Sequence, residues 1–180
     1  MAALLTSEKF VKSVTNISDN VAGKYLLPSI RESQDIVFKG IVGGALYDKL
    51  VALVESGDIR DPENAVYFDL VSEAQYFLAY SALVELTTKV SYKVGNLGVA
   101  KTQDENIYPA GEVELGRQQE YYQGKADSYC LALQTWILER RADYPELTDC
   151  ACEKMRSNLY SSASCGIFLG GARGRILPKV

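Results

Sequence analysis

The chain has 180 residues, of which 47% are hydrophobic and 23% are charged, and this composition is that of one globular domain rather than a disordered chain. The formal net charge of -4 argues against sequence-specific nucleic acid binding, because phosphate recognition needs a basic surface. The sequence contains no histidine, which excludes the Ser-His-Asp and Cys-His forms of nucleophilic catalysis and the usual zinc-enzyme ligand sets. We therefore expect no enzyme.

No apolar run approaches the roughly 18 residues that a membrane span needs. The first ten residues also lack the basic start and long apolar middle of a signal peptide. We expect a protein made in the cytoplasm, without a membrane partner and with reduced thiols. The spacings of its cysteines match no common zinc module, so we predict no metal and no cofactor; the cysteines are Cys130, Cys150, Cys152 and Cys165.

The first and third predicted helices have clear ends. Thr6 or Ser7 can cap a helix that runs to about Val14. Residues 45–56 have apolar side chains at helical spacing, and Gly57 is expected to stop that helix.

A second helix is predicted between these two. Proline fits the first helical turn, so we expect this helix to start at Pro28. It should place Ile30, Val37 and Ile41 on one side and end at the glycine pair 43–44.

The stretch from Asn64 to Tyr92 is predicted to be one long helix on which the rest of the chain is organised. Its core-facing stripe consists of Tyr67, Leu70, Val71, Ala74, Phe77, Leu78, Ala82, Leu86 and Val90. A second face is almost as apolar, and we predict a subunit interface at its residues Tyr76, Tyr80, Leu83 and Val84. Packing at the edge of the subunit's own core would explain the tyrosines equally well. The second face is covered either by the rest of this chain or by another copy of it.

A long loop is predicted at 94–111, with a brief hairpin near 99–102. A second long helix should run from Glu112 to about Ala142 and pack antiparallel to the first. A short helix is possible at 148–160. We thus predict an all-α bundle at 1–160, built on two long antiparallel helices with shorter N-terminal helices.

Residues 161–180 are predicted to be an extended C-terminal arm. They contain four glycines and no amphipathic helix pattern, yet they are richer in large apolar residues than a disordered tail. We predict that the arm docks on a partner protein through Ile167, Phe168, Leu169, Arg173, Arg175, Ile176 and Leu177.

The arrangement of these segments resembles the head-to-tail connector proteins of tailed bacteriophages, also called adaptor or head-completion proteins. The specific likeness is an I-x-x-x-Q-x-x-I/V run followed by a glycine and L-Y-x-x-L, here between Ile30 and Leu50. The closing sequence CGIFLGGARGR is also similar to the tails of connector-like proteins from phages of gut bacteria. The 94–111 loop and the C-terminal region are longer here than in the smallest members.

The resemblance implies a structural virion protein and not an enzyme. It implies a homo-oligomeric ring, commonly of twelve copies, that lies beneath the portal at the head-to-tail junction and binds both the portal and a further tail or ring protein. DNA would pass through the lumen without being read. The alternative is a cytosolic helical interaction or regulatory module that acts as a dimer. The two differ in symmetry, because a two-fold dimer uses one patch twice whereas a ring needs two complementary patches on each subunit.

Overall fold

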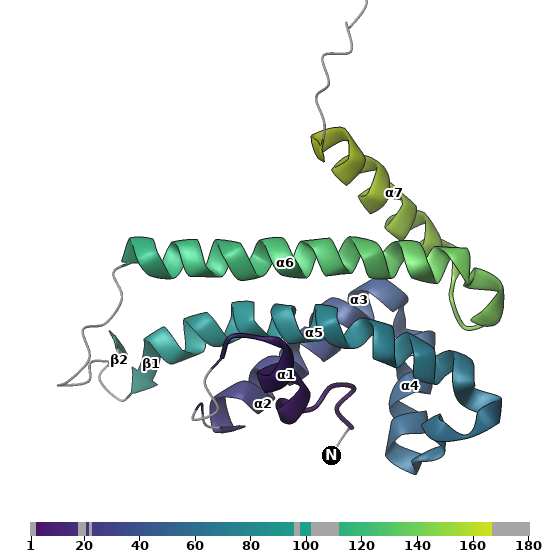
Figure 1. Cartoon of the computed structure of the whole chain (residues 1–180), viewed down its shortest axis with the longest axis horizontal. Helices are drawn as coiled ribbons and strands as arrows, with labels where there is room; N and C mark the ends of the chain where they lie inside the picture. Colours follow the sequence, from purple (N-terminus) through teal and green to yellow (C-terminus); the bar gives the residue numbers. More distant parts are fainter. Residues whose placement is uncertain (1–2, 18–20, 22, 96–97, 102–111, 167–180) are drawn as a thin grey trace, which may run out of the picture.

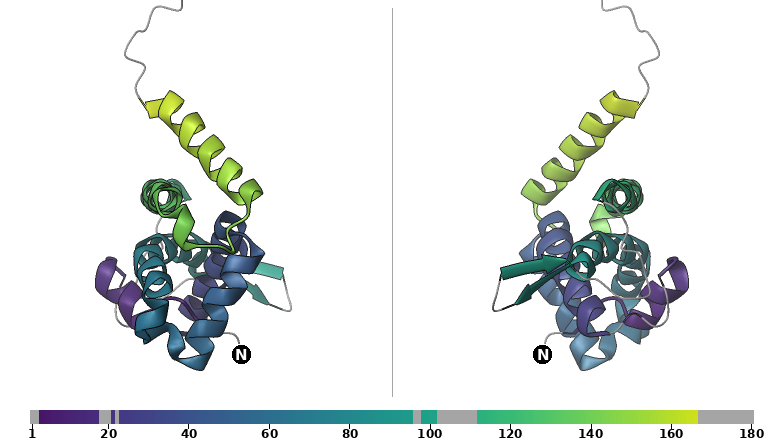
Figure 2. Two further views of the ribbon diagram at one scale, coloured as in Figure 1. Left: turned by 90° about the vertical axis from the view of Figure 1, so that its right-hand side faces the viewer. Right: turned by 90° about the vertical axis from the view of Figure 1, so that its left-hand side faces the viewer.

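In the computed structural model the described residues are 3–17, 21, 23–95, 98–101 and 112–166, and they confirm the predicted all-α class. Two long helices, α5 (Ala65–Ser91) and α6 (Glu112–Glu139), lie side by side and run in opposite directions (Figure 1). The shorter helices before α5 pack around it, and the last helix leaves the body near the end of α6 (Figures 1 and 2). The two long helices therefore form the axis of the molecule.

The remaining helices are α1 (Glu8–Val14), α2 (Gly23–Glu32), α3 (Lys39–Val42), α4 (Gly44–Ser56) and α7 (Asp149–Gly166). Short 3-10 helices lie at Asp58–Arg60, Pro62–Asn64 and Arg141–Asp143. The sheet in the described part of the chain is one antiparallel hairpin of β1 (Tyr92–Gly95) and β2 (Gly98–Lys101). This hairpin follows α5 directly and therefore starts earlier than the predicted one.

Local sequence signals place several helix ends correctly. The Ser7 hydroxyl oxygen accepts a hydrogen bond of 3.1 Å from the Phe10 N–H and caps α1. Gly43 and Gly57 end the helices before them with φ angles of 83° and 87°, which other residues rarely adopt.

The predicted start of the second helix at Pro28 is wrong. The helix α2 begins at Gly23, and Pro28 lies inside it. An interior proline loses one helical hydrogen bond and costs about 3 kcal/mol in general. Leu26 and Ile30 are fully buried on either side of the proline, and burying such side chains stabilises by about 1.5–3 kcal/mol each. Packing of α2 against α5 therefore outweighs the local preference of the proline.

The predicted grouping of Val37 with Ile30 on one side of the helix is also wrong, since Ile30 is fully buried and Val37 is exposed. A π-helix, Ser33–Phe38, joins α2 to α3 and changes the helical phase. Gln34, Phe38 and Val42 are fully buried at a spacing of four, and Ser33 is buried beside Gln34. Four residues make slightly more than one turn of an α-helix and slightly less than one turn of a π-helix. The two deviations cancel between Gln34 and Val42, so the side chains of Gln34, Phe38 and Val42 point in the same direction.

The long helix α5 is covered on both apolar faces along most of its length by its own chain. Leu70 and Leu78 belong to a core with α4, the π-helix and α6. Leu83 and Leu86 belong to a second core with residues of α1, α2 and α6. The subunit therefore has a complete interior of its own, and any interface between copies must use what remains exposed.

The last helix is longer than predicted. The helix α7 continues to Gly166, so the extended conformation predicted for 161–166 is wrong. No proline or glycine occurs between Asp149 and Gly166, and the helix continues to that glycine. The seven arm residues predicted to bind a partner, from Ile167 to Leu177, lie outside the described residues.

Candidate interaction surface

The two halves of the I-x-x-x-Q and L-Y-x-x-L motif meet at a buried hydrogen-bond cluster. The Gln34 side chain is 0% exposed, and its amide nitrogen donates to the Ala3 carbonyl at 3.0 Å and to the Tyr47 hydroxyl at 2.9 Å. Its amide oxygen accepts from the Leu5 N–H at 2.8 Å. Gln34 therefore joins the π-helix, α4 and the N-terminal segment.

The Tyr47 hydroxyl completes this cluster by donating to the Asp35 carboxylate. Burial, and then this hydrogen bond, raise the pKa of Tyr47 to about 12. The phenol is therefore neutral at physiological pH and remains a donor. The cluster has a structural role, because it satisfies buried polar groups and fixes the chain that enters α1.

An aromatic surface, defined as Phe10, Tyr76, Tyr80 and Tyr129, lies where α1, α5 and α6 meet. The Tyr129 ring on α6 stacks on Tyr76 and on Tyr80, with ring centroids 5.6 Å and 5.4 Å apart. Phe10 meets the Tyr76 ring edge-on at 5.4 Å. Tyr76 and Tyr129 are nevertheless 44% and 37% exposed. The surface combines fixed aromatic rings with open area, which is typical of protein interfaces.

The predicted interface residues fall into different environments. Tyr76 is exposed, Tyr80 and Val84 are half-buried, and Leu83 is 2% exposed in the subunit's own core. Burial is the main cause that raises the pKa of Tyr80, whose hydroxyl donates to the Val14 carbonyl at 3.4 Å. The predicted set does not include Phe10 or Tyr129, whose rings contact those of Tyr76 and Tyr80. Sequence spacing relates residues within one helix, and it does not reveal which residues of α1 and α6 face them.

Ile36 and Val37 are exposed on the π-helix, and Leu27 is exposed earlier, on α2; these three side chains are here called the α2 surface. Ile36 is 70% exposed, the highest value among the large apolar side chains in the part of the chain that the structure describes. None of the three was predicted as an interface residue.

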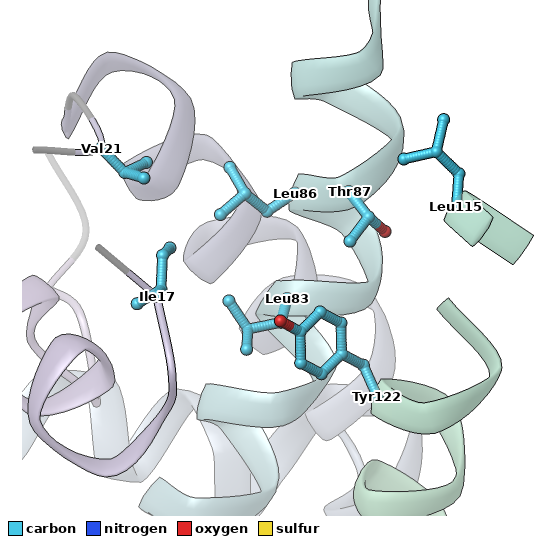
Figure 3. Close-up of a pocket in the computed structure, with 7 residues that line it drawn as sticks. All are labelled: Ile17, Val21, Leu83, Leu86, Thr87, Leu115 and Tyr122. Carbon is cyan, nitrogen blue, oxygen red and sulfur yellow. The ribbon is translucent and has the colours of Figure 1, made fainter. Parts of the chain in front are cut away.

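An open apolar pocket of about 220 Å³ lies near the C-terminal end of α5 and the start of α6 (Figure 3). It is lined by Ile17, Val21, Leu83, Leu86, Thr87, Leu115 and Tyr122. Its two hydroxyl groups are engaged elsewhere, since Thr87 donates to the Val84 carbonyl at 2.7 Å and Tyr122 to the Asn16 side chain at 2.9 Å. The pocket therefore offers a largely apolar lining.

The first turns of α7 are tied to the body. Cys152 and Met155 are buried, and the Lys154 ammonium donates to the Gly40 carbonyl at 3.3 Å. Arg141 forms an ion pair with Asp149 at the turn before the helix. After these first turns α7 extends away from the two long helices (Figures 1 and 2).

Within the described ranges no group of three potential ligands among cysteine and acidic residues could hold a metal ion. Cys130 is half-buried, and burial raises the pKa of its thiol to about 11. Cys150 is exposed and Cys152 is buried. A search of the same described residues found no helix long and apolar enough to span a membrane.

One family model matches residues 38–157, and it is described as a family of unknown function, DUF6712. The match runs from the end of the π-helix into α7 and contains both long helices. No curated protein and no solved structure matches the chain.

Proposed function

The chain belongs to the DUF6712 family, whose function is unknown, and we propose that it is a structural protein of a tailed-phage virion. In this proposal it forms a homo-oligomeric ring at the head-to-tail junction, binds the portal protein, and links it to the next ring or to the tail. DNA passes through the lumen, and the subunit catalyses no reaction.

The observation that carries the proposal is that large apolar side chains are exposed at more than one place on the subunit. The aromatic surface joins α1, α5 and α6, whereas the α2 surface belongs to α2 and the π-helix. A ring needs two different patches on each subunit, since each copy binds a neighbour on either side. Exposed aromatic and large aliphatic side chains are the groups that anchor such contacts.

The motif that resembles connector proteins supports the link to phages. Its glutamine and tyrosine, Gln34 and Tyr47, are in direct hydrogen-bonding contact although 13 residues separate them. A buried contact of this kind ties the motif to the packing of the subunit. The residues that carry the likeness therefore include buried residues of this subunit.

The charge of the chain also agrees with a DNA-conducting ring. A net charge of -4 gives no general attraction for phosphate, so a lumen formed by such subunits would let DNA slide. Helix α7 leaves the body of the subunit at an angle (Figures 1 and 2), and the C-terminal segment follows it in the sequence. We propose that this segment provides the contact with the portal, and that the assembly has twelve copies.

The proposal is tested by mixing the purified protein with the portal protein of the same genome. Native mass spectrometry of the subunit alone, of the portal alone and of the mixture reports the copy number, and electron microscopy shows the symmetry. We expect a ring of subunits on the portal. A stable two-fold dimer that ignores the portal would instead support the dimeric interaction module and refute the ring.

A variant pair makes the test specific to the aromatic surface. Tyr129→Ala should weaken ring assembly, because it removes the ring that stacks on both Tyr76 and Tyr80. Tyr121→Ala is the matched control, since Tyr121 is 51% exposed on the same helix and makes neither of these contacts. Equal assembly by both variants would exclude the aromatic surface from the subunit interface.

A further inference from the structure

The pocket between α5 and α6 has the size of a site for apolar side chains. Its volume of about 220 Å³ is small beside the roughly 300–1,000 Å³ of typical small-molecule sites. A cavity of about 150 Å³ already admits a benzene ring. The pocket can therefore hold one aromatic or one to two aliphatic side chains from a protein segment.

The C-terminal segment 167–180 has the matching chemistry. It begins with three consecutive large apolar residues, Ile167, Phe168 and Leu169. It also contains three basic residues and no acidic one, so it carries a formal charge of +3, and residues 1–166 account for -7 of the chain's net -4. An apolar triplet followed by positive charge suits an apolar pocket on an acidic protein.

The first turns of α6, which border the pocket, carry more acidic than basic side chains among the described residues. Glu114 and Glu120 are exposed on the first turns of α6, against one basic residue there, Arg117. Leu115 and Tyr122, which line the pocket, lie on the same turns. A basic segment that leaves the pocket along α6 would therefore meet more carboxylates than cations.

The described end of α7, at Gly166, lies far from the pocket of its own subunit. From Leu115 to the end of α6 is about 36 Å at 1.5 Å per residue, and α7 begins beside the last turns of α6 (Figure 1). Even a return straight along α6 would bring the 18 residues of α7 back by only about 27 Å. The helix instead leaves the body at an angle in both views. Ile167 follows its last residue directly.

We infer that the Ile167–Leu169 triplet of one copy occupies the α5/α6 pocket of a neighbouring copy. The inference rests on the proposed ring assembly and identifies one of its contacts. It also divides the C-terminal segment between two partners. The triplet binds the next subunit, and the distal residues, Arg173 to Leu177, remain for the portal.

A peptide measurement tests the pocket without the portal. The receptor is the full chain with Phe168→Ala, whose own segment has lost its aromatic anchor, and the probe is a fluorescent synthetic peptide of residues 164–180. We expect saturable binding that weakens at least tenfold when Leu115→Asp is added. Val113→Asp is the matched control, because Val113 is 69% exposed two residues earlier and does not line the pocket. It should change binding less than twofold.

Three results would overturn the inference. The peptide could fail to bind, as it would if another part of the same subunit filled the pocket. Leu115→Asp could leave binding unchanged. Val113→Asp could weaken binding as much as Leu115→Asp does. Circular dichroism melts of both aspartate variants show that the receptor is folded in each measurement.

A mixing experiment tests exchange between copies. Alone, the Phe168→Ala and Leu115→Asp chains should each lose self-association, since one lacks the anchor and the other the pocket. Mixed, they should form pairs and nothing larger, because the intact segment of the Leu115→Asp chain finds one intact pocket. Native mass spectrometry distinguishes these species. Absence of pairs, or unchanged oligomers of either variant, would refute the exchange. If the mixed variants form no pairs but the parent protein still binds the portal, the exchange is refuted and the proposed function is not.

Discussion

Replacing Gln34 with alanine should destabilise the subunit more than replacing the half-buried Gln75 with alanine. The substitution removes three hydrogen bonds from a fully buried side chain, to Ala3, Leu5 and Tyr47. A hydrogen bond contributes about 0.5–1.5 kcal/mol net, and a buried donor left without an acceptor costs about 1–3 kcal/mol. The Leu5 N–H becomes such a donor, because Leu5 is buried. We therefore expect a loss of about 3 kcal/mol.

Gln75→Ala is the matched control for this prediction. Gln75 is half-buried on α5 and also reaches the N-terminal segment, but through one bond of 3.4 Å to the Leu5 carbonyl. Its removal should cost less than about 1 kcal/mol. Urea unfolding followed by circular dichroism measures both free energies, and the melting temperature of Gln34→Ala should fall by roughly 6–12 °C for a domain of this size.

Amide hydrogen exchange can also show in which part of the molecule the stability is lost. Amide hydrogen exchange at Leu5 should accelerate in Gln34→Ala and stay near the parent rate in Gln75→Ala, because only the first variant removes the acceptor of that N–H. If Gln34→Ala is no less stable than Gln75→Ala, the buried cluster does not hold the N-terminal segment, and the account of the motif is refuted.

Three further predictions concern the aromatic rings and the C-terminal segment. Tyr129→Ala should lower the unfolding free energy by about 1–3 kcal/mol, since each stacked pair contributes about 0.5–1.5 kcal/mol, while Tyr121→Ala should lower it less in the same urea titration. The pKa of Tyr47 is raised to about 12 in the fold from its ordinary 10.0, so the stability it contributes is complete below pH 10 and is lost as the pH rises through 12. Unfolding free energies measured between these pH values should fall less steeply in Tyr47→Phe than in the parent, and equal slopes would contradict the assignment. Removing residues 167–180 should leave the melting temperature nearly unchanged and abolish partner binding, whereas a large drop in melting temperature would show that the segment belongs to the subunit's own core.

The ends of several elements could be predicted from the sequence because short-range chemistry determines them. A serine hydroxyl caps α1, and Gly43 and Gly57 adopt backbone angles that other residues avoid. The long helix α5 could also be predicted, since its apolar residues recur at helical spacing over more than seven turns. Each of these signals lies within a few residues of the feature that it predicts.

The candidate surfaces depended on contacts between distant segments. The stack of Tyr129 on Tyr76 and Tyr80 joins two helices, and the pocket takes side chains from three parts of the chain. Four interface residues were predicted on α5, yet Leu83 lies in the core because α1, α2 and α6 cover it. Periodicity identifies an apolar face, but only packing decides whether the same chain covers it.

The segment around the π-helix shows most clearly which features follow from local sequence and which depend on tertiary packing. The sequence by itself determined that residues 28–42 are helical and that the helix stops at Gly43, because both follow from local propensity and backbone freedom. The tertiary structure alone decided that Pro28 lies inside the helix and that Val37 faces outward. The free energy gained by burying neighbouring side chains against α5 outweighs the local cost of an interior proline and a widened turn. This gain depends on contacts with α5, so the sequence of the segment alone does not predict it.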